Sequence, residues 1–325
     1  MLFEEGSENQ RIWHVIKLGH VFGGDSLIKE RKIQNDYSMD KITRFRAYQL
    51  GVKGASFSLA VDDNFTLIEA RLNDCNRANV LNEMRIAGAK NLSLLHITSW
   101  DVDHCNPDEL YDILHYLKPQ RIQYPGYRPD SDSGKESLEM ISDYLSQKQI
   151  PGSEISPKYI NALEAGESAR FSTILYNPTA EYEKHNDMSI VALFRKGRFT
   201  VLSLGDCESP EIANTIMNGS IANSETDVML MAHHGADNGF TTEEFIKKIA
   251  PKIAICACDY DNQYDHPRKE VREILHNNDV RFFTTKTGDV LIVCDVDNNV
   301  HVTNYIGNGT KVSSTFKFRP KFTIK

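Results

Sequence analysis

The chain has 325 residues and a mass of 36.9 kDa, which suits one large domain with appendages or two small domains. Hydrophobic residues make up 40% and charged residues 25%, so the chain can bury a sizeable core and does not have the composition of a disordered protein. The net charge of −8 argues against a basic coat over the whole surface and leaves a local patch for any nucleic-acid contact.

Hydrophobic patterning divides the chain into three parts. Residues 1–41 show no clear period and are taken as an N-terminal extension, and the regular pattern of a domain covers 42–303. In the first half of this domain, apolar stretches predict strands at 43–50, 55–61, 65–70 and 92–98, and helices at 76–87 and 135–147.

One helix of the first half has an explicit start. Asn106 is a favourable N-cap, and Pro107 suits the first helical position. Leu110, Leu114 and Leu117 then recur at helical spacing, which predicts one buried face.

The second half of the domain alternates short strands with helices. Thr241 and Glu244 have the spacing of a capping box, which predicts a helix start there. Further elements are a hairpin of 190–194 with 200–204, strands at 227–231, 253–258, 280–284, 290–294 and 299–303, and a helix over 267–276. Mixed strands with interspersed helices predict an α/β layered fold.

The tail, 304–325, is basic and contains phenylalanine. From Lys311 to Lys325 it holds five basic and no acidic side chains, with Phe316 and Phe318 alternating with basic residues. An exposed edge strand or arm explains this pattern, and so does a nucleic-acid contact in which aromatic rings stack on bases.

Other features bear on localisation. The longest uninterrupted apolar run, Ile253–Cys258, has six residues, which is too short to cross a bilayer. The first residues do not have the pattern of a signal peptide, and the six cysteines contain no CxxC pair. We therefore expect a cytoplasmic protein with free thiols and no membrane partner.

Four polar clusters each follow a predicted strand. They are 98–104, 204–206, 233–235 and 262–267. Ligand sites in α/β folds collect at the carboxyl ends of strands, so these loops can converge. Taken singly, a Gly-Asp pair is usually a turn, a His-Pro pair a helix start and a His-His pair structural. Together their carboxylates and imidazoles predict a divalent-metal hydrolytic site.

This ordered set resembles the metallo-β-lactamase-fold hydrolases, and within them the soluble domain of DNA-uptake competence-channel proteins. The likeness runs from about residue 42 to residue 300. The matching residues are Asp101, Asp103, His104, Asn186, Ser189, Gly205, Asp206, His233, His234, Gly235, Asn262, Tyr264, His266 and Pro267. The resemblance implies an αβ/βα four-layer sandwich, in which two packed mixed sheets carry helices on their outer faces.

The resemblance also implies roles for these residues and a cofactor of one or two divalent ions (Mn²⁺, Zn²⁺ or Mg²⁺). Asp103, His104 and His266 would hold one metal, with Asp206 bridging to a second. Asp101 and His234 would complete the ligand set of the other metal. His233 would face the scissile group as a proton donor and act in catalysis with Asp103.

The chain departs from the family pattern at two positions of the metal loops. Ser99 stands where the family has its first histidine, so the metal beside Asp101 loses a nitrogen donor. Oxygen-rich ligation favours Mn²⁺ or Mg²⁺, while the remaining imidazoles are also suitable ligands for Zn²⁺. His96 either compensates for this loss or packs in the core. Ala236 replaces a serine that often follows His-His-Gly.

Six residues are expected on the substrate side: Lys53, Ser99, Trp100, Asn186, Asn262 and Tyr264. Lys53 either contacts a phosphate or is a solvated loop lysine. Trp100 is either a hydrophobic plug beside the sheet or a platform on which a base stacks.

These observations favour a metal-dependent hydrolase of phosphodiesters, foremost a nuclease with DNA as its partner, alone or as a subunit of a larger defence-type system. One alternative is a hydrolase of a small ester, phosphorylcholine or cyclic nucleotide. Another is a partly degenerate metal-binding scaffold, to which the loss of the histidine at Ser99 points.

Overall fold

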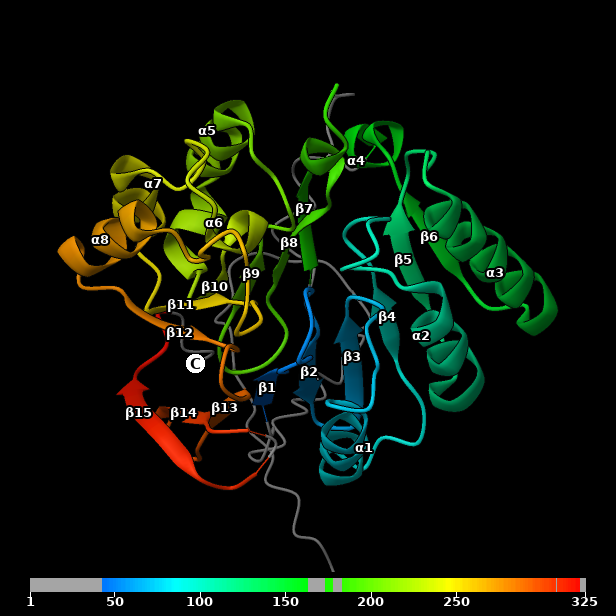
Figure 1. The fold of residues 1–325 in the computed structure, drawn as a ribbon, viewed down its shortest axis with the longest axis horizontal. Coiled ribbons are helices and arrows are strands. Elements are labelled where there is room, and N and C mark those ends of the chain that lie inside the picture. The colour runs from blue at the N-terminus through cyan, green and yellow to red at the C-terminus, as the bar shows by residue number, and fades with distance from the viewer. Residues whose placement is uncertain (1–42, 163–172, 178–182, 308, 322–325) are drawn as a thin grey trace, which may run out of the picture. The chain divides into compact units, whose positions relative to one another are not determined.

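The computed structural model describes residues 43–162, 173–177, 183–307 and 309–321 (Figure 1). The predicted N-terminal extension, 1–41, lies outside the described residues. Among the helices that are described, none is long and apolar enough to cross a membrane.

The larger sheet has nine strands in the order β15-β14-β13-β1-β2-β3-β4-β5-β6. Pairing is antiparallel from β15 to β3 and parallel from β3 to β6. The strands are β1 (Thr43–Ala47), β2 (Phe57–Val61), β3 (Asn64–Ile68), β4 (Leu94–His96), β5 (Ile122–Pro125), β6 (Gly152–Ile155), β13 (Val290–Cys294), β14 (Val300–Tyr305) and β15 (Val312–Phe318).

The smaller sheet has six strands in the order β12-β11-β10-β9-β8-β7. Strands β9 to β12 are parallel, whereas β7 and β8 run antiparallel to their neighbours. The strands are β7 (Thr173–Asn177), β8 (Val191–Phe194), β9 (Val201–Ser203), β10 (Val228–Leu230), β11 (Ile253–Cys256) and β12 (Arg281–Thr284).

Helices cover the outer face of each sheet (Figure 1). Those on the larger sheet are α1 (Arg77–Ile86), α2 (Pro107–Asp112), which continues as the π-helical turn η1 (Ile113–Leu117), and α3 (Asp132–Lys148). Those on the smaller sheet include α5 (Pro210–Asn218), α6 (Ser220–Glu225), α7 (Glu243–Ile249) and α8 (Lys269–Asn277). The short α4 (Pro157–Ala162) links β6 to the segment before β7.

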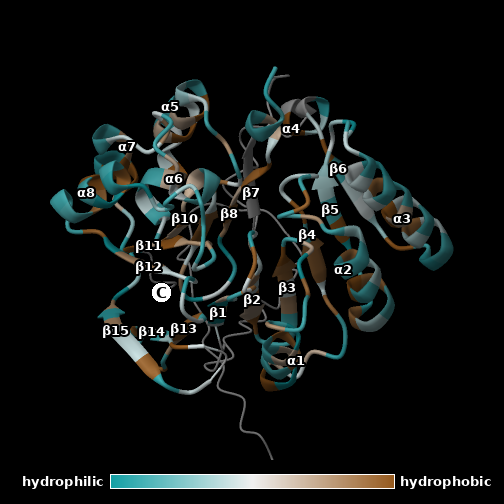
Figure 2. Cartoon of the chain, in the orientation of Figure 1, coloured by the Kyte–Doolittle hydropathy of each residue, from teal (hydrophilic) through white to brown (hydrophobic). Residues whose placement is uncertain are grey.

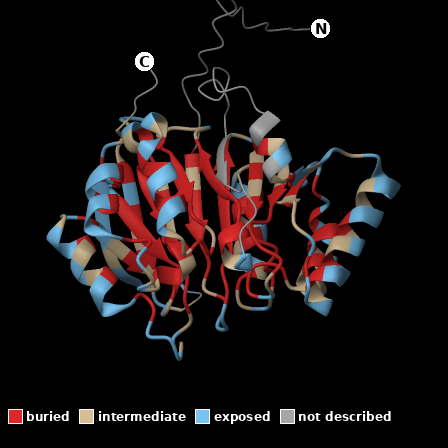
Figure 3. Cartoon of the chain, turned by 90° about the horizontal axis from the view of Figure 1, so that it is seen from above, coloured by how far each residue is buried: buried red, intermediate tan, exposed pale blue. Residues whose placement is uncertain are grey.

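Three hydrophobic cores fill the spaces between these four layers. Alternation along β10 shows why: Val228 and Leu230 belong to the core between the sheets, whereas Met229 faces the helices of the smaller sheet. The strands in the middle of both sheets are accordingly buried and apolar, and the outer helix faces are polar and exposed (Figures 2 and 3). This arrangement confirms the predicted αβ/βα four-layer sandwich.

Local predictions hold to different degrees. Asn106 does cap α2, since its side chain accepts a hydrogen bond from the Glu109 N–H. The predicted capping box at Thr241 is wrong by one residue, because Thr242 is the N-cap and accepts from the Phe245 N–H. Helix α8 begins at Lys269, two residues after the predicted Pro267.

The basic tail contributes a strand and a cross-sheet contact. Strand β15 pairs with β14 at the edge of the larger sheet. Just beyond it, Lys321 donates its backbone N–H to Asp227 Oδ1 (2.7 Å), beside β10 of the smaller sheet. Its Nζ also donates to the carbonyl of Ile249 (2.6 Å). Lys321 therefore connects the two sheets.

A buried ion network joins β1 to its surroundings. Arg46 Nε lies 2.7 Å from Asp289 Oδ2, and its Nη1 lies 3.0 Å from Glu83 Oε1 on α1. Arg44 also pairs with Glu83, at 2.7 Å. The network fixes α1 against β1 and the start of β13.

We expect Glu83→Ala to lower the free energy of unfolding by about 3 kcal/mol or more, because Arg46 would keep a buried charge with one partner removed. Urea denaturation followed by circular dichroism measures this loss. The matched control is Glu243→Ala, which removes an exposed pair with Lys247 and should cost less than about 0.5 kcal/mol. Equal effects of the two substitutions would contradict the role given to the network.

Candidate metal centre

The predicted metal residues lie on four loops that follow strands. Asp103 and His104 follow β4 of the larger sheet, and Asp206 follows β9. His234 follows β10, in the short helical turn η4 (Ala232–Gly235). Because β9 and β10 are parallel neighbours, their carboxyl ends bring Asp206 and His234 to the same edge of the smaller sheet.

Four side chains converge in a buried cluster: Asp103, His104, Asp206 and His234 each place one ligand atom within 4.8 Å of all the others. His104 Nε2 lies 3.0 Å from Asp206 Oδ1. His234 Nε2 lies 3.6 Å from the same oxygen and 3.7 Å from Asp103 Oδ2. Two imidazole nitrogens and two carboxylates form the donor set of a divalent-metal site.

The outer ring nitrogen of each histidine is held by a fixed partner. Nδ1 of His104 lies 3.2 Å from Glu69 Oε1, and Nδ1 of His234 lies 2.7 Å from the carbonyl oxygen of Ala257. Such contacts place the ring proton on Nδ1 and leave Nε2 as a free ligand atom. Both Nε2 atoms are buried and face the carboxylates of Asp103 and Asp206. The residues therefore fit a bound cation, which would satisfy both nitrogens.

A small cavity lies beside these atoms. Its volume is about 20 Å³, and Glu69, His104, Asp206 and His234 are among its lining residues. This volume is comparable to the space that one water molecule occupies. The cluster thus has room for a single ion or water against its ligand atoms.

Electrostatics in the cluster favour charged forms despite burial. Burial raises the pKa of Asp103 and Asp206, but the neighbouring His104 and His234 imidazoles outweigh it, so both pKa values lie below the ordinary range. Conversely, burial lowers the pKa of His104, yet Asp206 and Glu69 raise it well above its usual value. The pKa of His234 is raised for the same reason, with Asp206 as the main partner.

Glu69 is a functional residue that the sequence analysis missed. It is buried just after β3, at a φ of +69°, where its carboxylate accepts hydrogen bonds from the Thr98 N–H (3.0 Å) and Oγ1 (2.6 Å). The parallel pairing of β3 with β4 brings it to the metal loop. Its only sign in the sequence is an acidic residue inside a predicted buried strand.

His233 and His234 occupy a tight left-handed turn. Their φ values are +42° and +54°, followed by Gly235 at +81°. A side chain at Gly235 would meet Pro267 Cβ at 2.7 Å. Non-glycine residues with positive φ are uncommon and concentrate at functional sites.

The predicted proton donor His233 has an acidic partner that was also missed. Its Nδ1 lies 2.9 Å from Glu208 Oε1. Glu208 is itself held by Asn186, whose Nδ2 donates at 2.8 Å, and by Lys184 at 2.9 Å. Asn186, expected to contact substrate, thus also fixes the carboxylate that holds His233.

Two of the predicted ligands lie outside the four-donor cluster. His266 has its ring centroid 6.3 Å from that of His234 and 6.0 Å from that of His233. Burial, together with the neighbouring His234 and His233 rings, lowers the pKa of His266 to about 4. Asp101 is half-buried, and burial raises the pKa of its carboxyl.

Ser99 and Trp100 pack inside the protein. Ser99 Oγ accepts the Asp101 N–H (3.2 Å) and lies 3.3 Å from the Tyr127 hydroxyl. Trp100 is 1% exposed and donates its indole N–H to the Tyr127 carbonyl (3.0 Å). The tryptophan therefore plugs the core and offers no exposed ring face. His96 is likewise in the core, with Nδ1 2.9 Å from Gln123 Oε1.

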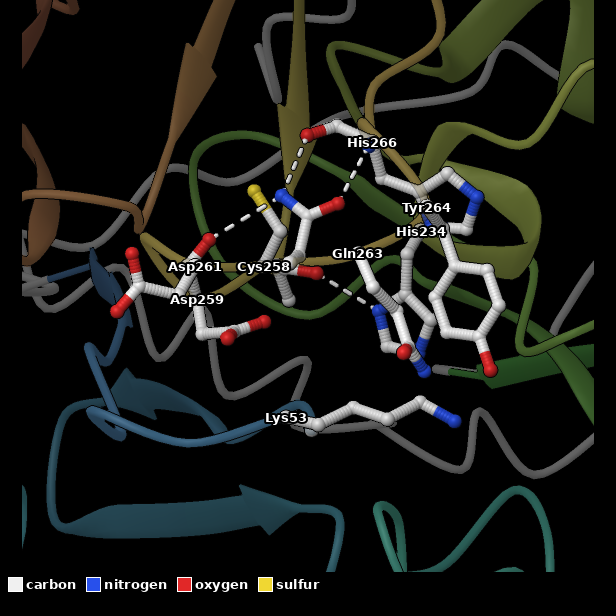
Figure 4. A pocket seen from close by; sticks show the side chains of 11 residues that line it. Lys53, His234, Cys258, Asp259, Asp261, Gln263, Tyr264 and His266 are labelled. Atoms are coloured by element: carbon white, nitrogen blue, oxygen red, sulfur yellow. Dashed lines mark hydrogen bonds between the residues drawn. The ribbon is translucent and has the colours of Figure 1, made fainter.

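A pocket of about 160 Å³ opens beside the cluster (Figure 4). Lys53, His234, Tyr264 and His266 lie on one side of it, with Asp259 and Asp261 on the other; Asn262 and Gln263 also line it. Asn262 shapes the loop, since its Oδ1 accepts the His266 N–H (2.6 Å) and its Nδ2 donates to the His266 carbonyl (3.1 Å).

The αβ/βα architecture and the buried Asp/His donor set match what the resemblance to the metallo-β-lactamase-fold hydrolases implies. No family model matches the chain. Among curated proteins, it is 27% identical over 203 residues to ComE operon protein 3 of Bacillus subtilis (strain 168). That match covers 61% of this chain but 24% of the relative, so the chain spans about a quarter of that protein's length. The predicted resemblance is thereby confirmed.

Solved structures similar to this chain include two that cover most of it. One is a mutant of the CmlA β-hydroxylase, with a TM-score of 0.48, 12% identity, and coverage of 78% of this chain and 53% of that chain. The other is Igni18, a metallo hydrolase from the archaeon Ignicoccus hospitalis, with a TM-score of 0.45, 14% identity, and coverage of 77% of this chain and 98% of that chain.

Asp206→Ala should abolish metal binding, because Asp206 is the carboxylate nearest to both free Nε2 atoms. Metal content after dialysis against Mn²⁺ or Zn²⁺, measured by plasma mass spectrometry, tests this. The exposed Asp237, three residues beyond His234, provides the control Asp237→Ala, which should retain full metal content. Full content in both variants would place the ion elsewhere.

Metal affinity should rise with pH. The pKa values of His104 and His234 are raised in the metal-free chain, so both rings must lose a proton before Nε2 can bind an ion. Below those pKa values the affinity should increase about tenfold per pH unit for each proton released. Titration calorimetry at pH 6 and pH 8, in buffers of different ionisation enthalpy, measures both affinity and proton release. An affinity independent of pH would contradict this assignment.

Proposed function

We propose that this protein hydrolyses phosphodiester bonds and that its main substrate is DNA. The observation that carries the proposal is the position of Lys53, whose ammonium group lies 2.9 Å from Asp103 Oδ2 at the pocket beside the donor cluster. A cation beside a metal centre suits a substrate that carries negative charge at the reacting group. The resemblance to DNA-uptake proteins supports a nucleic acid as that substrate.

The residues divide the work as follows. Asp103, His104, Asp206 and His234 would hold a divalent ion, which supplies Lewis-acid stabilisation and a water of lowered pKa when bound. Lys53 would attract a phosphate oxygen.

The other polar residues of the site would position the proton donor and the substrate. His233, oriented by Glu208, would donate a proton to the leaving oxygen. The half-exposed ring of Tyr264, stacked on His266 with centroids 5.5 Å apart, offers a face for a base.

Attraction of DNA to a chain of net charge −8 depends on local basic surface. Strand β15 and the residue after it expose Lys317 and Arg319 together with Phe316, which is 36% exposed. We include this edge in the proposed DNA contact. A partner subunit that supplies further basic surface belongs to the same proposal, as does a cytoplasmic location.

A small zwitterionic substrate is the second candidate. The pocket of about 160 Å³ places Lys53 on one side and Asp259 and Asp261 on the other. Opposite charges at the two sides suit a molecule such as phosphorylcholine, with an anionic and a cationic end.

The test is incubation of purified protein with circular and linear DNA in Mn²⁺, Mg²⁺ or Zn²⁺, with an EDTA control. We expect metal-dependent cleavage that falls more than about 100-fold in His104→Ala, since even residues that only orient a ligand typically cost 10–100-fold. The control His276→Ala removes an exposed histidine of α8 and should cleave normally. Hydrolysis of phosphorylcholine without DNA cleavage would favour the second candidate instead.

A further inference from the structure

Asp101, the predicted ligand of the second metal, lies outside the donor cluster. Among the described residues, the ligand atoms that lie within 4.8 Å of one another belong to Asp103, His104, Asp206 and His234. Ser99, which replaces the family's first histidine, directs its hydroxyl to the Asp101 N–H and Tyr127. Its oxygen therefore stabilises the loop.

Lys53 places a positive charge beside the cluster. Its Nζ lies 2.9 Å from Asp103 Oδ2 and 5.7 Å from the ring centroid of Tyr264, while its side chain remains 58% exposed. Figure 4 shows the side chain extending toward His234 and Tyr264. Asp103 Oδ2 thus lies close to both the Lys53 ammonium group and His234 Nε2.

The backbone around Lys53 is fixed to the metal loop. The Lys53 carbonyl accepts a hydrogen bond from Arg71 Nη1 (2.9 Å), and the Ala55 N–H donates to the Asp103 carbonyl (3.0 Å). Gly54, at a φ of +136°, lies between them, and a side chain there would clash with both Arg71 and the Asp103 backbone. The loop thus delivers Lys53 to one side of Asp103.

Arg71 is itself held in place. Its Nε lies 2.9 Å from Glu109 Oε2 on α2, and it is 4% exposed. Because Arg71 is buried and paired with Glu109, it holds the backbone of Lys53 in a fixed position beside Asp103.

We propose that the ammonium group of Lys53 takes the place of a second metal ion, so that the centre binds one divalent ion per chain. The inference rests on the metal centre of the proposed function. The Lys53 ammonium group lies 2.9 Å from Asp103 Oδ2. It would repel a second metal ion bound beside Asp101 and Asp103, so such an ion would have to displace the lysine. The single ion and Lys53 then form the cationic pair that faces an anionic substrate.

The experiment counts Mn²⁺ ions in the full chain by plasma mass spectrometry and by electron paramagnetic resonance, without substrate. We expect one ion in the wild type and in Lys53→Arg, with the spectrum of isolated Mn²⁺. Lys53→Met frees Asp103 Oδ2 and should bind two ions, with the spectrum of a coupled pair. The control Lys248→Met, on the exposed side of α7, should bind one.

Two ions in the wild type, or one in Lys53→Met, would overturn the inference. A wild type that binds no ion would overturn it together with the metal centre. Absence of DNA cleavage by a chain that binds one ion bears on the proposed substrate alone, so the two failures are distinguishable.

Discussion

The site depends on one constraint: two carboxylates and two imidazoles are buried against one another and need compensating charge. In the metal-free chain, protons on His104 and His234 supply that charge, which is why the pKa values of both rings are raised. A divalent ion bound to the two Nε2 atoms and the two carboxylates would supply it instead. The layered fold makes such burial possible, because the loops after β4, β9 and β10 bring the charges together and the cores around them stay apolar.

The sequence was sufficient to predict the fold class and the loops of the site. Both rest on local signals: hydrophobic period for the strands, and carboxylates and histidines directly after them. Asp103, His104, Asp206 and His234 do converge, but His266 and Asp101 lie outside the cluster. The order of motifs along the sequence predicts which loops converge. It does not predict which side chains of those loops reach the donor cluster.

The residues that sequence reasoning missed act through contacts between distant segments. Glu69 reaches His104 because β3 pairs in parallel with β4, and Ala257 reaches His234 through a backbone carbonyl that any residue would supply. Glu208 is close in sequence to Asp206. Its contact with His233, however, depends on the left-handed turn in which His233 lies. None of these contacts has a period or a motif, so they are visible only in three dimensions.

The contact between Lys321 and Asp227 has a mechanical consequence. Strand β15 belongs to the larger sheet, while the next residues are hydrogen-bonded beside β10 of the smaller one, close in sequence to the turn that carries His234. The segment from β15 to Lys321 therefore contacts both sheets. The two sheets that each contribute ligands are therefore joined by a backbone contact as well as by the core between them.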